Sequence, residues 1–151
     1  MAVIMQAMTS DDPSEIQGLL KELDHLDAGT HFMHESVNPN DPKHYSRYWF
    51  AWANSLYGEM VIKKELGLNY YPGDGTYVNP KLNPDWNRVD MNLPVTFGDA
   101  QGSTLHLSGQ GAGPMSAAIN GRAATFDPRK GVKITGNGLD VVIRTGPTQS
   151  E

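Results

Sequence analysis

The apolar segment from Arg47 to Leu66 constrains the fold of this chain most. It predicts a helix that must be buried against other parts of the protein on nearly every side. Its apolar residues are Trp49, Phe50, Ala51, Trp52, Ala53, Leu56, Tyr57, Met60 and Val61. A helix with so little polar surface is usually buried. Gly67 stands where a helix C-terminal glycine is expected, after Lys63 and Lys64, which suit the negative end of the helix dipole. We therefore expect a buried helix from about residue 47 to residue 66.

Two shorter helices are expected before this segment. Asp12 is a suitable N-cap, with Pro13 at the first helical position and Glu15 placed close to a capping box. Apolar residues at 16, 19, 20, 23 and 26 predict a helix over about 13–26. Residues 1–8 also keep helical spacing and predict the last turns of a helix that begins without a cap. Because these helices cannot enclose a core alone, we expect them to pack against the β part or against helices outside this sequence.

The composition changes after Gly67. Residues 67–89 are rich in Asn, Pro, Gly and Tyr and show little periodicity, which predicts a long ordered connection. From residue 90 onward the pattern favours strands. Asn120-Gly121 and Asn137-Gly138 each lie between two β-type runs, which predicts two hairpins. We therefore predict a mixed α and β fold that ends in a small antiparallel β-sandwich-like domain.

The composition also excludes several classes of function. The 151-residue chain has a net charge of −5 and no basic run, which argues against a nucleic-acid or anionic-membrane surface. It has no cysteine, so disulfides, thiolate catalysis and Cys-ligated zinc are excluded. No stretch approaches the roughly 20 apolar residues of a membrane span. We expect neither a nucleic-acid partner nor a membrane partner.

The loop before the apolar helix, roughly residues 27–46, holds the best catalytic candidate. Glu35 lies between His34 and Ser36 in a stretch punctuated by X-Pro and Asx turn positions. A carboxylate held in a turn beside an aromatic helix can act as a general acid or base. The alternative is a loop carboxylate that pairs with Arg47 or caps a helix.

The same region offers two further chemistries. His31, His34 and His44 suggest a metal site with Glu35, but no HExxH-type spacing is present, so hydrogen-bonding histidines are the better interpretation. We expect no metal and no cofactor. Asp74, within the turn sequence at residues 71–75, is at most a weak calcium candidate.

Aromatic residues beside Arg47 could bind a sugar. The faces of Trp49 and Trp52 can stack on the C–H-rich surface of a sugar ring, and the alternative is that both belong to the core. Arg47 also has two alternative roles: it donates to a substrate hydroxyl, or it pairs with a carboxylate, either Glu35 or Asp41.

The run DAGTHFMHESVNPNDPKHYSRYWFAWANSLYGEM resembles the C-terminal end of glycoside hydrolase family 125, the metal-independent exo-acting α-mannosidases. The preceding run, MTSDDPSEIQGLLKELDHLD, resembles the penultimate helix of that family. The HES triplet and the WFAWAN helix start are the specific motifs, and the match covers about residues 1–66. The departures from the family pattern are small and remove no catalytic residue. His31 stands where Gly is expected, Val37 where Phe or Ile is expected, and Tyr48 where Pro is expected.

The resemblance implies C-terminal helices of an (α/α)6 toroid and metal-independent hydrolysis of terminal α-1,6-linked mannose with inversion. The partner would be a mannose-containing oligosaccharide or glycan. Glu35 would be the general base that activates water, and His34, Ser36, Arg47 and Trp49 would bind the substrate. The family's general acid is an Asp in an earlier region that this sequence lacks.

We interpret residues 1–66 as a C-terminal fragment of the catalytic domain, 67–89 as a connection and 90–151 as a β accessory domain. The fragment is expected to need the remainder of the catalytic domain and to be inactive alone. The alternative function is a carbohydrate-binding or structural β module with a helical remnant. A glycan bound to the β domain, without cleavage by the full-length protein, would favour that alternative.

Overall fold

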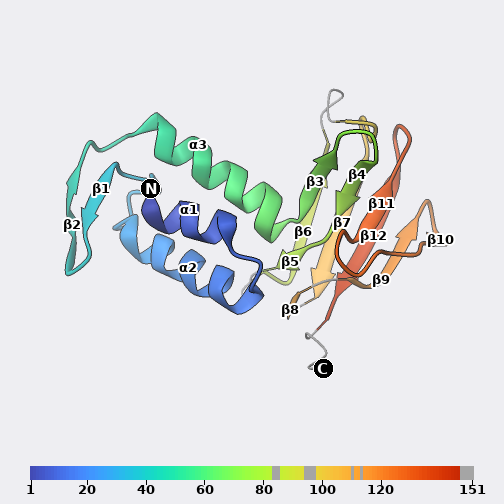
Figure 1. Ribbon diagram of the computed structural model, residues 1–151, viewed down its shortest axis with the longest axis horizontal. Helices are drawn as coiled ribbons and strands as arrows, with labels where there is room; N and C mark the ends of the chain where they lie inside the picture. The colour runs from blue at the N-terminus through green and yellow to red at the C-terminus, as the bar shows by residue number, and fades with distance from the viewer. Residues whose placement is uncertain (83–85, 94–97, 110, 113, 147–151) are drawn as a thin grey trace. The chain divides into compact units, whose positions relative to one another are not determined.

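In the computed structural model the chain forms two compact units, residues 1–64 and residues 65–151 (Figure 1). The structure describes residues 1–82, 86–93, 98–109, 111–112 and 114–146. The first unit contains helices and one small hairpin, and the second contains strands, so the mixed α and β class is confirmed. Within the described ranges, no helix is long and apolar enough to cross a membrane.

The second helix of the first unit has the bounds that the sequence predicted. Helix α2 spans Pro13–Leu26, and the Asp12 side chain caps it by accepting a hydrogen bond from the Ser14 backbone N–H at 2.8 Å. The Glu15 carboxylate accepts from the Ser10 hydroxyl at 2.6 Å, so it does not close a capping box on Asp12. Helix α1 spans Ala2–Thr9. The core of the unit consists of Ile4, Ala7, Ile16, Leu19, Leu20, Leu23 and Met60.

The third helix begins later than the sequence predicted. Helix α3 spans Ala51–Met60 and continues as a π-helical turn, η1, over Val61–Glu65. It cannot begin at Arg47, because that residue has a φ of 49°. Phe50, with φ −116° and ψ 102°, is also outside the helical region.

The aromatic residues at the start of α3 are exposed in this structure. Tyr48, Trp49 and Trp52 have 54%, 63% and 67% of their surface accessible, whereas Ala53 and Met60 are buried. The expectation of a helix buried nearly all round is therefore wrong for this chain, and of the two alternatives for Trp49 and Trp52 the structure excludes a place in the core of the first unit. The core of the first unit covers only one side of the helix, so the opposite side faces solvent.

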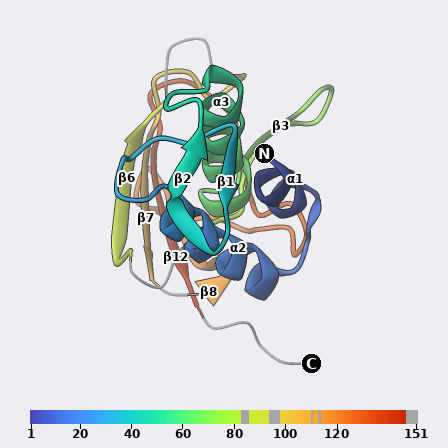
Figure 2. The ribbon, with the colours of Figure 1, turned by 90° about the vertical axis from the view of Figure 1, so that its left-hand side faces the viewer.

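The loop predicted over residues 27–46 contains a small β-hairpin. Strand β1 (Ser36–Asn38) pairs antiparallel with β2 (Asp41–Ser46), and both lie beside one another in Figure 2. The Asx and X-Pro positions form the turn of this hairpin. In the turn, the Asn40 backbone N–H donates to the Asn38 side-chain oxygen at 3.0 Å. The pairing shifts register between Val37 and Asn38, and Pro42 is without a partner residue at this irregularity, where a proline is tolerated in a strand.

The described residues of the second unit form three sheets. Their strand orders are β10-β9-β12-β7-β6, β11-β4-β3 and β5-β8. The strands are β3 (Leu68–Tyr71), β4 (Gly75–Val78), β5 (Lys81–Leu82), β6 (Arg88–Asn92), β7 (Thr104–Gly109), β8 (Gly111–Ala112), β9 (Pro114–Ile119), β10 (Arg122–Ala123), β11 (Val132–Ile134) and β12 (Asp140–Thr145).

The stretch from residue 67 to 89 is part of the second unit and not a connection to it. Strands β3, β4 and β5 and the start of β6 all lie in this stretch. The sequence did not reveal β4 because this strand is buried at all four positions and therefore shows no alternation of polar and apolar residues. The turn sequence at residues 71–75 joins β3 to β4, with Tyr71 opposite Gly75.

One of the two predicted hairpins is confirmed. Strands β9 and β10 pair with Ile119 opposite Arg122, and Asn120 and Gly121 between them have φ values of 50° and 73°. Two consecutive positive φ values are what a type I′ turn requires.

The other hairpin prediction is wrong. Strand β11 pairs with β4, while β12 pairs with β9 and β7, so Asn137-Gly138 joins strands that are not partners. The backbone N–H groups of Gly136 and Gly138 donate instead to Asp99 and Gln101, each at 2.9 Å. Strands β7 and β12 run parallel, so the largest sheet is mixed and not purely antiparallel.

Candidate active site

The register of the β1–β2 hairpin places Glu35 beside Arg47. Ser36 and Ser46 are opposite one another at the open end of the hairpin, and their hydroxyls lie 2.7 Å apart. Glu35 precedes the first of these residues and Arg47 follows the second. The Arg47 Nε atom therefore lies 3.2 Å from the Glu35 Oε2 atom, in an ion pair whose side chains are 64% and 37% exposed.

Arg47 adopts a backbone conformation that a non-glycine residue rarely uses. Its φ of 49° lies in the left-handed region, which costs roughly 1–2 kcal/mol. The turn directs the guanidinium back over the Phe50 ring, 5.6 Å from its centre, as well as towards Glu35. Such strain is often found where a side chain must point in one direction for function.

The loop before Glu35 is fastened to α3 by Asn54. The Asn54 side chain accepts from the Met33 backbone N–H at 3.0 Å and donates to the Met33 carbonyl at 2.8 Å. The same amide group donates to the Phe50 carbonyl, also at 2.8 Å. Sequence reasoning missed this residue, although a lone amide at the start of an apolar helix was the signal for it.

His34 is buried, and its contacts hold the loop in place. It is 4% exposed, and its ring stacks on Tyr45 with centres 3.7 Å apart. Its Nδ1 atom donates to the Tyr48 carbonyl at 2.8 Å, since a carbonyl can only accept, and its Nε2 atom bonds to the Thr30 hydroxyl at 3.1 Å. Both ring nitrogens are thus engaged within the first unit, and a contact of His34 with substrate stays a prediction.

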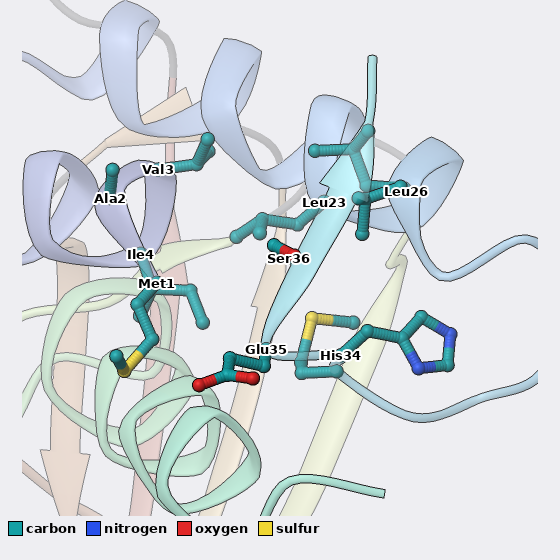
Figure 3. A pocket seen from close by; sticks show the side chains of 11 residues that line it. Met1, Ala2, Val3, Ile4, Leu23, Leu26, His34, Glu35 and Ser36 are labelled. Atoms are coloured by element: carbon teal, nitrogen blue, oxygen red, sulfur yellow. The ribbon is translucent and has the colours of Figure 1, made fainter. Parts of the chain in front are cut away.

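A pocket of about 260 Å³ lies directly beside Glu35. Its wall is formed by α1 and α2 residues, among them Ile4 and Leu23, and by residues 33–37 of the loop. Figure 3 shows the Glu35 carboxylate and the His34 ring directed to opposite sides. The pocket therefore presents one carboxylate next to a largely aliphatic surface.

The predicted site residues divide into two groups. His34, Glu35 and Ser36 line the pocket, whereas Arg47 and Trp49 do not. Arg47 is joined to the site through its ion pair with Glu35, and Trp49 projects into solvent. The structure thus brings four of the five residues together.

The alternative metal ligands have other partners. His44 Nδ1 lies 2.7 Å from the Asp41 carboxylate, and the exposed His31 lies 3.7 Å from Asp27. Across the described residues, no group of three His, Cys, Asp or Glu side chains is arranged to hold a metal ion. Asp74, the weak calcium candidate, is paired with Lys130 and Lys133 instead.

The comparison with known protein families gives this site its context. The family model of the metal-independent alpha-mannosidases (GH125) matches residues 1–62, the stretch that contains Glu35 and its hairpin. Residues 1–62 are thus similar to glycoside hydrolase family 125, and we call them the family-125 segment. The family-125 segment ends within η1, and the family match does not extend to the strands of the second unit.

A curated relative matches the same part of the chain. The meiotically up-regulated gene 157 protein of Schizosaccharomyces pombe is 50% identical over 62 residues, which is 41% of this chain and 12% of the relative. The family-125 segment therefore spans about an eighth of that relative's length. The relative's name describes its expression and not an activity.

Proposed function

We propose that the family-125 segment supplies the general-base side of an α-mannosidase active site, with Glu35 as the base. The observation that carries the proposal is the carboxylate itself. It sits in the HES motif at a pocket, with Oε2 facing Arg47. Its Oε1 atom has no hydrogen-bond or ion-pair partner in the described part of the chain, so one oxygen remains to accept a proton from water.

The proposed reaction is hydrolysis of a terminal α-1,6-linked mannose with inversion. Glu35 accepts a proton from a water molecule while the water oxygen attacks the anomeric carbon opposite to the departing oxygen. A second carboxyl group, about 6.5–9.5 Å away, must protonate the leaving group. We assign that acid to a part of the catalytic domain outside this chain, within an (α/α)6 toroid to which α1, α2 and α3 contribute.

The remaining predicted residues would hold the sugar and the base. Arg47 would fix the direction of the Glu35 carboxylate, and Ser36 and His34 would complete the rim of the pocket. Trp49, exposed here, would offer a face to the sugar ring. No metal and no cofactor take part in this scheme, as the family description "metal-independent" suggests.

The test is a Glu35→Gln variant of a full-length protein that carries this segment. Turnover of α-1,6-mannobiose should fall by about 10²-fold or more, because the amide cannot accept the proton. Azide should restore activity and give a mannosyl azide of inverted configuration. Glu59→Gln is the matched control, since Glu59 pairs with Lys63 on the surface of α3. Near-normal turnover in the Glu35 variant would exclude it as the base.

A further inference from the structure

The second unit has a hollow on the exposed face of its largest sheet. Strands β6, β7 and β12 are neighbours there, and a pocket of about 340 Å³ opens over them. On the other face of these strands, Leu105, Val141 and Ile143 are buried. The hollow is lined by Arg88, His106, Leu107, Ser108, Val142 and Arg144.

The strand register explains why the hollow is there. Arg88 is opposite Ser108 across the β6–β7 pair, and Ser108 is opposite Arg144 across the β7–β12 pair. Because neighbouring strands lie about 4.8 Å apart, the two arginine backbones stand roughly 10 Å apart with one serine between them. Two long cationic side chains thus flank a short hydroxyl, which leaves room for a small ligand above the serine.

The two arginines still have donors to offer. Arg144 has no hydrogen-bond or ion-pair partner among the residues that the structure describes. Arg88 uses its Nε group, which lies 2.8 Å from the Asp90 carboxylate, and among the described residues no hydrogen bond from its Nη groups is present. A guanidinium is always charged, so both arginines stay cationic at any working pH.

The nearby carboxylates face His106. The Asp90 carboxylate lies 2.6 Å from His106 Nδ1, and the Asp140 carboxylate lies 3.1 Å from His106 Nε2. The hydrogen bond from His106, followed by that from Arg88, lowers the pKa of Asp90. His106 is itself part of the lining of the hollow, whereas Asp90 and Asp140 are not among its lining residues.

We propose that Arg88, Ser108 and Arg144 bind a tetrahedral oxyanion, either free phosphate or sulfate or the same group esterified to a sugar. Guanidinium groups bind such oxygens in pairs, and the Ser108 hydroxyl adds a third donor. Val142, in the neighbouring row, offers an apolar contact to the carbon skeleton of an ester. The site lies wholly in the second unit and is independent of mannosidase activity.

The experiment uses the full 151-residue chain with ¹⁵N-labelled arginine and follows the side-chain Nε–Hε NMR signals. Sodium phosphate should shift the Arg88 and Arg144 signals saturably, and sodium chloride of equal ionic strength should not. Arg144→Gln should raise the apparent Kd of phosphate about tenfold or more, since it removes a charge-assisted pair of hydrogen bonds. Arg144→Lys should have an intermediate effect on the Kd, because lysine keeps the positive charge but lacks the paired N–H donors of a guanidinium.

Arg122→Gln is the matched control, because it removes the same charge from β10, outside the hollow. It should leave the Kd unchanged. Equal shifts in chloride, or undiminished binding in the Arg144→Gln variant, would overturn the proposal. A parallel titration with mannose, mannose 6-phosphate and inorganic phosphate separates the two sources. Tighter binding of the sugar phosphate than of inorganic phosphate assigns the site to an ester, and the reverse order assigns it to the free anion.

Discussion

The Oε2 atom of Glu35 lies 3.2 Å from the Nε atom of Arg47, across the open end of the β1–β2 hairpin. The two residues are 12 positions apart in the sequence and meet because Ser36 is opposite Ser46. The contact occupies one carboxylate oxygen and leaves the other for water. Arg47 forms this contact from a left-handed backbone conformation, so the ion pair and the strained residue coincide.

This arrangement predicts that Arg47 acts through Glu35. In a full-length enzyme, Arg47→Gln should lower kcat/KM about tenfold while leaving folding nearly intact, because an exposed ion pair contributes only about 0–1 kcal/mol to stability. In a Glu35→Gln background the same change should have little further effect, since there is no base left to orient. Steady-state kinetics of the four-member cycle provide the measurement. Additive losses would instead place Arg47 in direct contact with the substrate.

The isolated 151-residue chain should not hydrolyse α-1,6-mannobiose. General acid catalysis typically contributes about 10²–10⁴-fold, and we assign the acid to a region outside this chain. The exposed Tyr48, Trp49 and Trp52 should also make the chain associate, which light scattering after size-exclusion chromatography can measure. Trp49→Ser with Trp52→Ser should reduce the association. Turnover by a monodisperse chain would show that it contains its own acid, and Asp41 would be the first residue to test.

Chelation should not affect the full-length enzyme. The first unit holds its histidines with hydrogen bonds, as in the case of His34 with Tyr48 and Thr30. After exhaustive EDTA treatment, turnover of α-1,6-mannobiose should equal that of the untreated enzyme. A loss of activity that zinc or calcium restores would count against the proposed metal-free mechanism. Recovery after mere removal of EDTA, without added metal, would identify the loss as inhibition by the chelator.

Asp74 should make the stability of the second unit depend on pH. Hydrogen bonds from Lys130, Tyr77 and Lys133, in that order of importance, lower the pKa of Asp74 from 3.8 to about 2. A carboxyl group whose pKa is lower in the folded state stabilises that state above its unfolded pKa and loses this effect as the pH falls. Asp74→Asn should therefore lower the denaturation midpoint at pH 7, and the difference should disappear between about pH 4 and pH 2. A difference that stays constant over this range would contradict the prediction.

Gly67→Ala should destabilise the second unit more than Gly73→Ala. Both glycines have left-handed φ values, 68° and 81°, so each substitution incurs about 1–2 kcal/mol of backbone strain. A Cβ atom at Gly67 would also lie 2.0 Å from the Asn79 carbonyl oxygen, whereas one at Gly73 would meet nothing within 4 Å. Urea unfolding followed by circular dichroism measures both free energies. Equal losses would mean that the backbone around Asn79 moves away without cost.

Local sequence determined the elements whose stabilising contacts are short in range. The bounds of α2 follow from Asp12, Pro13 and the apolar stripe, because a cap and a 3.6-residue period act within one helix. The turn at Asn120-Gly121 was equally predictable, since two adjacent residues that tolerate positive φ select a type I′ hairpin. The family resemblance of residues 1–62 was also present in the sequence, in the HES and WFAWAN motifs.

Tertiary structure decided which strands pair, which aromatics are covered and which groups meet Glu35. Asn137-Gly138 has the same local chemistry as Asn120-Gly121, yet its flanking strands pair elsewhere. Burial of β4 on both faces removed the alternation that would have revealed it. Trp49 and Trp52 are large apolar residues of the kind that form a core, but they lie on the side of α3 that the first unit leaves exposed. Pairing and burial depend on what surrounds a segment, and a sequence pattern describes only the segment itself.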